Sequence, residues 1–233
     1  MNDQPGTAPA AVEAADIEAV LFDFGGVLFN WQPPVLIQSV LPHLARNEAE
    51  ALDLAQRVFR SFVPGSEWSE FDRGALSPDE VCAQIAARTG LPAADLHRLL
   101  EAIPPHLEPV QPTVQWLEAL HDQGVPLYFL SNMPRPYMHF LCERHAFLKR
   151  FRSGVFSCEV GQVKPNPDIF HTVAQRCGLR PEHTVFIDDH PHNVQTARGL
   201  GWRAVQFQSA TQCRVELARL GWAPRAAVGG VAF

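Results

Sequence analysis

Five short runs of almost uninterrupted apolar residues recur along the 233-residue chain. They are Ala19–Phe22, Pro126–Leu130, Gly154–Phe156, Thr184–Ile187 and Arg203–Phe207. A strand with one face in water alternates apolar and polar residues, whereas a strand buried on both faces is apolar throughout. These runs therefore predict strands of a parallel sheet that is covered by helices on both sides.

Helical patterns fill the gaps between the later runs. They lie at about Arg135–Ala146, Pro167–Cys177 and Asn193–Leu200. Strands that alternate with helices in this way form βαβ units. We therefore expect an α/β fold with a doubly wound, Rossmann-like parallel sheet.

The gap between the first two runs is too long for a single crossover helix. From Trp31 to about Val110 the patterns are helical only, and they include a Ser-Pro-Asp-Glu helix start at Ser77. We expect an all-helical cap domain at residues 31–109, inserted into a core made of residues 17–30 and 110–222. The chain re-enters the core through a helix at Thr113–Asp122, which ends before Gly124.

Composition excludes several classes of protein. The formal net charge of -6 argues against a nucleic-acid binder, and no apolar stretch approaches the length of a membrane span. The five cysteines match neither a CxxC nor a zinc pattern, which favours free thiols in the cytoplasm. Residues 1–16 lack a signal-peptide pattern, so they are predicted to be a disordered tail, and residues 223–233 a loose C-terminal tail. We expect a monomer or homodimer.

Polar residues follow the predicted strands at the edge where parallel sheets bind their ligands. In chain order they are Asp23, Ser131, Asn132, Lys164, Asp188 and Asp189. Each of them alone is often a turn or helix-cap residue. Together they bring three carboxylates and one ammonium to a hydroxyl and an amide, which favours a site for an anionic substrate and a divalent metal.

The residues that carry these features resemble the four motifs of the haloacid dehalogenase-like (HAD) hydrolase superfamily. The motifs are Leu21–Leu28 (LFDFGGVL), Leu130–Asn132, Lys164-Pro165 and Phe186–Asp189. The resemblance covers residues 17–210 and includes a helical cap in the position of the family's type 1 caps. Gly25, Arg135 and the pair Asp188-Asp189 look closest to the members that hydrolyse α-D-glucose 1-phosphate.

The resemblance implies a Mg²⁺-dependent phosphatase of a small phosphorylated metabolite, such as a sugar phosphate. Asp23 would be the nucleophile and would form an aspartyl-phosphate that water then hydrolyses. The Mg²⁺ ligands would be Asp23, Asp188, Asp189 and the backbone carbonyl of Gly25. The groups that bind substrate would be Ser131, Asn132, Arg135 and Lys164, with Ser131 and Lys164 on the phosphoryl oxygens.

The chain departs from the family at position 25. Family phosphatases usually carry a second Asp two residues after the nucleophile, which serves as general acid and base, and this chain has Gly25. His190 is our candidate stand-in, with His192 beside it, since imidazole titrates near neutrality; the alternative is that both are helix-start residues. The cap aromatics Trp31, Trp68 and Phe71 line the substrate pocket or pack in the cap core, and the residues alone do not separate these readings.

Two other functions remain open. A metal-free 2-haloacid dehalogenase would also lack the second Asp, because a halide leaves without a proton. Adjacent carboxylates at Asp188 and Asp189 argue against it, since they give nothing to a site that binds a carboxylate anion. A catalytically poor binding or regulatory protein of the same fold is the second alternative.

The chain has 17 arginines but only two lysines, Lys149 and Lys164. Lys149 lies in an arginine-rich segment, whereas Lys164 is expected beside carboxylates, where arginine's larger planar group fits poorly. We predict that Lys164→Arg abolishes phosphate release and that Lys149→Arg leaves it unchanged, measured in parallel on purified proteins. Full activity of Lys164→Arg would show that the site is misassigned.

Overall fold

The computed structural model describes residues 17–60, 63 and 65–222, so both predicted tails lie outside the described residues. The described part contains a five-stranded, all-parallel sheet with the order β3-β2-β1-β4-β5. Its strands are β1 (Ala19–Phe22), β2 (Leu127–Ser131), β3 (Ser153–Phe156), β4 (Thr184–Asp188) and β5 (Arg203–Gln206). Each predicted run forms one of these strands, which confirms the predicted α/β fold.

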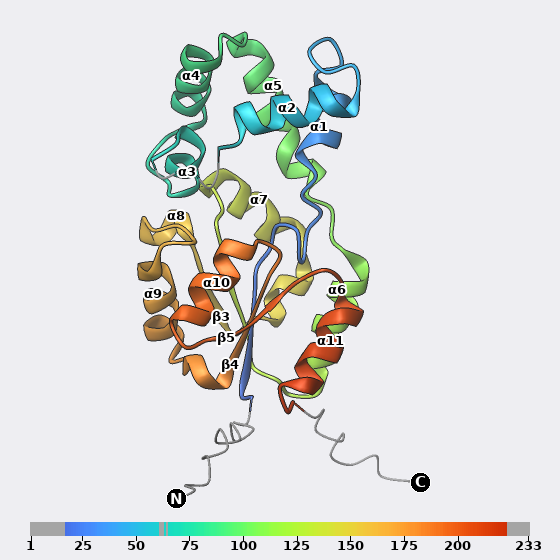
Figure 1. Ribbon diagram of the computed structural model, residues 1–233, viewed down its shortest axis with the longest axis vertical. Helices are drawn as coiled ribbons and strands as arrows, with labels where there is room; N and C mark the ends of the chain where they lie inside the picture. The colour runs from blue at the N-terminus through green and yellow to red at the C-terminus, as the bar shows by residue number, and fades with distance from the viewer. Residues whose placement is uncertain (1–16, 61–62, 64, 223–233) are drawn as a thin grey trace, which may run out of the picture.

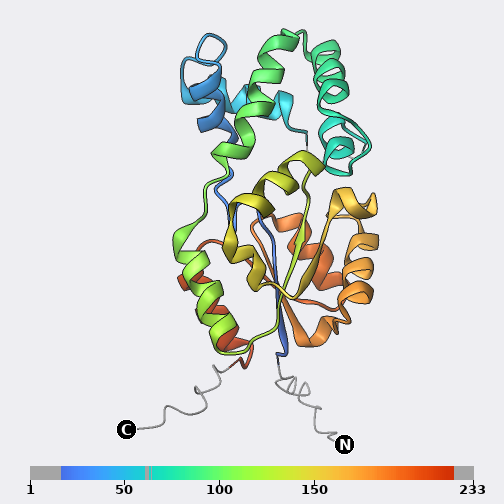
Figure 2. The same ribbon diagram turned by 180° about the vertical axis from the view of Figure 1, so that it is seen from behind.

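The sheet is buried on both faces, which explains why its strands are apolar throughout. Along β1, Val20 and Phe22 point to the side of α6 (Gln111–Asp122) and α11 (Ala210–Arg219). Leu21, between them, packs on the opposite side with residues of α9 (Pro167–Cys177) and α10 (Pro191–Gly199). Figures 1 and 2 show these two helix layers on either side of the strands. Successive side chains of a strand alternate in direction, so both sets are apolar.

Five helices lie between β1 and α6 in the chain, and Figure 1 shows them together beyond one end of the sheet. They are α1 (Pro33–Val40), α2 (Glu48–Val58), α3 (Glu67–Asp72), α4 (Pro78–Thr89) and α5 (Ala93–His106). We refer to the α1–α5 segment as the cap. Helix α4 begins with the predicted capping box, in which the Ser77 hydroxyl accepts from the Glu80 N–H and the Glu80 carboxylate accepts from the Ser77 N–H.

The remaining helical segments lie in the connections from β2 to β3, from β3 to α9 and from α9 to β4. They are α7 (Arg135–Arg144), α8 (Ser157–Val160) and the 3₁₀ helices Ala146–Arg150 and Pro181–His183. Helix α8 was not predicted, since four residues are too few to show a helical period. Helix α10 begins at Pro191 rather than at the predicted Asn193, because His190 is its N-cap. Among the described helices, none has the length and apolar character needed to cross a membrane.

Hydrogen bonds join the cap to the core at several places, two of which position it over the ends of the strands. At the first, the two chain crossings pair with each other: the Asn30 N–H donates to the Glu108 carbonyl and the Val110 N–H to the Leu28 carbonyl, both at 2.8 Å. At the second, the Ser157 hydroxyl at the start of α8 donates to the Asp72 carbonyl at the end of α3. The cap is therefore fixed over the carboxyl ends of the strands.

Candidate active site

The sheet register brings the predicted site residues together. The central strand β1 pairs with both β2 and β4, and Phe22 lies opposite Phe129 on one side and Ile187 on the other. Asp23 directly follows β1, so it lies beside the end of β4, where Asp188 is the last strand residue. Strands β2 and β3 lie on one side of β1, and β4 and β5 lie on the other. The strand order therefore reverses at β1, and α/β sheets bind their ligands at such switch points.

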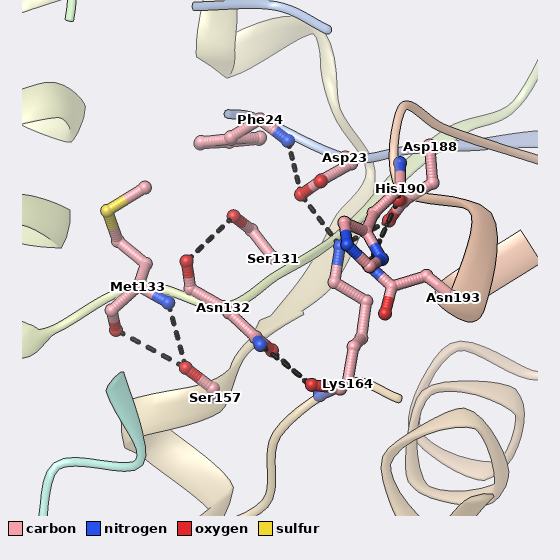
Figure 3. A network of polar contacts seen from close by, with 10 residues as sticks. All are labelled: Asp23, Phe24, Ser131, Asn132, Met133, Ser157, Lys164, Asp188, His190 and Asn193. Carbon is pink, nitrogen blue, oxygen red and sulfur yellow. Dashed lines mark hydrogen bonds and ion pairs between the residues drawn. The ribbon is translucent and has the colours of Figure 1, made fainter. Parts of the chain in front are cut away.

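Lys164 connects two of the carboxylates. Its ammonium Nζ lies 2.8 Å from Asp23 Oδ1 and 2.7 Å from Asp188 Oδ2, and the lysine is 1% exposed (Figure 3). Burial alone lowers the pKa of Lys164, but the carboxylates of Asp188 and Asp23 outweigh this and raise it above its usual value. The lysine therefore stays charged, and it holds two like charges close together.

Asp188 is the most strongly held carboxylate of the site. Besides Lys164, the His190 backbone N–H donates to Oδ1 at 2.8 Å, and the Asn193 amide Nδ2 lies 3.0 Å from each carboxylate oxygen. Asp188 is completely buried. Asn193 thus supports the Asp188 carboxylate.

Asp23 presents one oxygen to the pocket. Its Oδ1 accepts from Lys164 and from the Phe24 backbone N–H at 2.7 Å, whereas no described residue donates to Oδ2. Burial raises the pKa of Asp23 well above its ordinary value, the Lys164 ammonium opposes this shift, and the charges of Asp188 and Asp189 add to it. Because two donors fix Oδ1, the other carboxylate oxygen, Oδ2, is held in an orientation suited to attack on a bound electrophile.

Three carboxylates form a cluster suited to a hard cation. Oxygens of Asp23, Asp188 and Asp189 all lie within 4.8 Å of one another. Asp189 as a whole is exposed, but its carboxyl group packs against the Gly26 backbone. A Cβ added to Gly26 would lie only 2.3 Å from Asp189 Oδ2. Desolvation and the Asp188 charge raise the pKa of Asp189 to about 6. One ammonium against three carboxylates leaves a negative excess, and carboxylate oxygens are the ligands that Mg²⁺ prefers.

Asn132 fixes the backbone of Lys164. Its Oδ1 accepts from the Lys164 N–H at 2.8 Å and its Nδ2 donates to the Lys164 carbonyl at 2.9 Å. Ser131 lies just before it, is 1% exposed, and its hydroxyl approaches the Asn132 carbonyl at 3.4 Å. The sequence predicted substrate binding for Asn132, and in this structure its amide makes a two-bond clamp on the lysine loop.

A pocket opens between these residues and the cap. Its lining consists of Asp23, Gly25, Trp31, Trp68, Asp72, Ile103, Leu107, Asn132, Met133, Pro134, Tyr137, Lys164, Asp189, His190 and Asn193. Of the cap aromatics singled out from the sequence, Trp31 and Trp68 line it, whereas Phe71 packs between the Trp68 and Tyr137 rings. Asp72 was missed, because nothing local in its sequence indicates contact with the core.

Arg135 and His190 have other contacts in this structure. The Arg135 guanidinium donates to the Cys158 carbonyl at 2.8 Å, and Arg135 is not among the described residues that line the pocket. The His190 ring lines the pocket, and its Nδ1 accepts from the His192 N–H at the start of α10. Burial lowers the pKa of His190, although Asp188 opposes this.

The chain belongs to the haloacid dehalogenase-like hydrolase family, whose model matches residues 17–201. It is 28% identical over 204 residues to the sesquiterpene phosphatase astK of Aspergillus oryzae, covering 87% of this chain and 96% of that protein. It is 26% identical to the drimenol cyclase drtB of Aspergillus calidoustus, covering 89% of this chain but only 37% of that protein. The predicted family and the predicted enzyme class, a hydrolase, are confirmed.

Solved structures show the same fold. The HAD family enzyme bt-2542 of Bacteroides thetaiotaomicron superposes with a TM-score of 0.65 at 24% identity, covering 84% of this chain and 95% of that chain. That enzyme is also known in complex with magnesium and inorganic phosphate. The L-2-haloacid dehalogenase of Xanthobacter autotrophicus superposes with a TM-score of 0.62 at 20% identity, covering 87% of this chain and 82% of that chain.

The support that Asn193 gives to Asp188 predicts a role in metal affinity. Asn193→Ala removes the amide donor from a buried carboxylate, and loss of such a partner typically weakens metal binding about 10–100-fold. We expect this loss for Mg²⁺ in a calorimetric titration. The control is Asn47→Ala, which removes the N-cap of α2 in the cap and should leave Mg²⁺ affinity unchanged. Wild-type affinity in Asn193→Ala would contradict the assignment.

Proposed function

We propose that this protein is a Mg²⁺-dependent phosphatase that hydrolyses phosphomonoesters through an aspartyl-phosphate at Asp23. The observation that carries this proposal is the arrangement around that carboxylate: Oδ1 is fixed by two donors and Oδ2 is open to the pocket. The full-length relative is named a phosphatase, which supports the same reaction class.

The residues of the site fit a magnesium ion. Asp23, Asp188 and Asp189 would hold it, together with the backbone carbonyl of Gly25, which lines the pocket. Asn193 Oδ1 is buried and has no donor among the described residues, and metal-bound water is a suitable donor for it. When bound, the ion supplies positive charge that offsets the charge of the transferring phosphoryl group.

The side chains divide the remaining work. Asp23 Oδ2 attacks phosphorus while the bond to the leaving oxygen breaks, and water later attacks the same phosphorus to release Asp23 and inorganic phosphate. Lys164 binds phosphoryl oxygens and, between substrates, separates the charges of Asp23 and Asp188. We expect the buried Ser131 hydroxyl to bind another phosphoryl oxygen, while Asn132 holds the lysine backbone.

The lining of the pocket favours a hydrocarbon group on the substrate. Away from the motif loops, and apart from Asp72, the lining residues are aromatic or aliphatic; they are Trp31, Trp68, Ile103, Leu107, Met133, Pro134 and Tyr137. The Tyr137 hydroxyl already donates to the Leu100 carbonyl at 3.0 Å. Apart from the Asp72 carboxyl group, this wall gives sugar hydroxyls few hydrogen bonds in exchange for the water contacts that they would lose. We therefore propose phosphate esters of apolar alcohols as preferred substrates. The sugar phosphate that the sequence motifs imply stays a prediction, and the assay described below compares the two classes.

The charge of the site disfavours the two other functions. A carboxylate substrate of a metal-free dehalogenase would meet three carboxylates and one ammonium, which repel it. A non-catalytic protein would have no use for a buried, fully hydrogen-bonded Asp188 beside an ammonium, since such groups are costly to bury.

We predict Mg²⁺-dependent phosphate release with a preference for apolar esters. The assay compares farnesyl phosphate, glucose 1-phosphate and p-nitrophenyl phosphate, each with Mg²⁺ or with EDTA. We expect kcat/KM for farnesyl phosphate to exceed that for glucose 1-phosphate at least about tenfold, corresponding to about 1.4 kcal/mol of added apolar burial. EDTA should abolish all three activities.

The alternatives have distinct outcomes in the same experiment. Chloride release from 2-chloropropionate that persists in EDTA would establish the dehalogenase. Absence of any turnover, together with no thermal shift on adding BeF₃⁻ and Mg²⁺, would establish the non-catalytic protein.

Trp31 offers a test of the substrate class. It is half-buried and lines the pocket, so Trp31→Ala should raise KM for farnesyl phosphate about tenfold and leave KM for glucose 1-phosphate nearly unchanged. The matched control is Trp222→Ala, a half-buried tryptophan outside the pocket. Equal changes in KM for the two esters would count against a hydrocarbon-binding wall.

A further inference from the structure

The cap contributes one carboxyl group to the active-site pocket, that of Asp72. Asp72 is 5% exposed and lines the pocket together with Asp23 and Lys164. Among the described residues, no hydrogen-bond donor or ion-pair partner contacts its carboxyl oxygens, although its backbone carbonyl is bonded. A buried carboxyl without a structural partner costs free energy, so its retention points to a role in the pocket.

The backbone around Asp72 is held firmly against the core. The Ser157 hydroxyl donates to the Asp72 carbonyl and also accepts from the Met133 N–H at 2.8 Å, which ties α3 to both core segments of the site. Gly74, at φ +78°, lies so close to α8 that a Cβ would be 3.0 Å from the Cys158 carbonyl oxygen. The side chain of Asp72 is therefore positioned by the docking of the cap.

The surroundings of Asp72 keep its carboxyl group protonated near neutral pH. Burial raises the pKa of Asp72 to about 8, and Lys164 is the charge that opposes this shift. Tyr137 on α7 and Cys158 on α8 are the other ionisable groups that interact with it, and both are neutral at pH 7 because burial raises the pKa of each. The titratable groups of Asp23, Asp189 and His190 also line the pocket.

A phosphomonoesterase with Gly25 needs a proton for its leaving group from elsewhere. In an in-line displacement at phosphorus, the leaving oxygen lies opposite the nucleophile, and the attacking water later takes the same place. Asp23 of the core and Asp72 of the cap both line the pocket, so a leaving group opposite Asp23 would extend toward the cap. We propose that Asp72 is the general acid and base of the reaction, in place of the carboxylate absent at position 25; this inference rests on the proposed phosphatase function.

The proposed hydrolysis has two steps, and Asp72 transfers a proton in each. First, Asp23 Oδ2 bonds to phosphorus, the ester P–O bond breaks, and the leaving oxygen takes the carboxyl proton of Asp72, which gives the free alcohol and the Asp72 carboxylate. Second, that carboxylate accepts a proton from water as the water oxygen bonds to phosphorus and the bond to Asp23 breaks. Asp23 and protonated Asp72 are restored, and inorganic phosphate is released.

Asp72 differs from His190, the candidate taken from the sequence. His190 is adjacent to Asp189, and its ring caps α10, the helix that carries Asn193, so its substitution also disturbs the support of the proposed metal ligands. Asp72 belongs to the cap and is far from those residues in the chain, so its substitution tests the proton transfer itself.

The test is Asp72→Asn, which keeps the shape of the side chain and removes its proton transfer. With n-hexyl phosphate, whose leaving group needs a proton, kcat should fall at least 100-fold. With p-nitrophenyl phosphate, whose leaving group needs none, one equivalent of p-nitrophenolate should appear in a burst, followed by slow turnover. The burst phase should leave a phosphoryl adduct on the protein, detectable by mass spectrometry.

The control is Asp95→Asn, a buried aspartate of the cap outside the pocket whose carboxyl oxygen lies 3.0 Å from His43 Nε2. It should turn over both esters at wild-type kcat. The assignment is overturned if Asp72→Asn retains kcat within threefold on n-hexyl phosphate, or if it loses activity on both esters without a burst. Absence of phosphate release by the wild type would instead contradict the proposed function itself.

A stability measurement adds a readout that does not depend on turnover. In the unfolded chain an Asp loses its proton near pH 3.9, whereas folded Asp72 keeps it to about pH 8. Between these values the folded state binds more protons, so this residue lowers stability as the pH rises. Asp72→Asn should therefore have a higher Tm than the wild type, by a margin larger at pH 8 than at pH 5; a lower Tm at both would show a structural role.

Discussion

A buried ammonium between two buried carboxylates is the contact on which this site depends. Lys164 reaches Asp23 and Asp188 at 2.8 and 2.7 Å in a region that excludes water, where an unpaired charge costs several kcal/mol. Each partner therefore requires the others. The Asn132 side chain, which binds the lysine backbone, and the Asn193 amide, which binds Asp188, hold the three charged groups in position. Sheet ends, lysine loop and α10 are held together through this contact.

The site divides its chemistry between core and cap. Every group proposed to bind metal or phosphate lies at the carboxyl end of a strand or in the segment that follows it, and the parallel register aligns the ends of β1, β2 and β4. The cap supplies apolar walls and one buried carboxyl group, that of Asp72. With this division, a change in the cap residues can alter which organic group is bound, while the residues that bind metal and phosphate stay the same.

Much of this arrangement was predictable from the sequence, for a physical reason. Strands buried on both faces are apolar throughout, so all five were located to within one residue at either end. The parallel sheet then fixed the convergence of Asp23, Lys164 and Asp188. Asp72 and the Asn132 clamp were not predictable in this way, since both depend on contacts between segments far apart in the chain. Arg135 illustrates the same limit, because its guanidinium is directed by the Cys158 carbonyl.

The seam between α3 and α8 has a consequence for the proposed proton transfer. The Ser157 hydroxyl bond, the close approach of Gly74 and the packing of Phe71 on the Tyr137 ring hold this end of the cap against the core. These contacts set where the Asp72 carboxyl group lies in the pocket. A substitution in the seam would therefore change the proton transfer without touching either reacting carboxyl group.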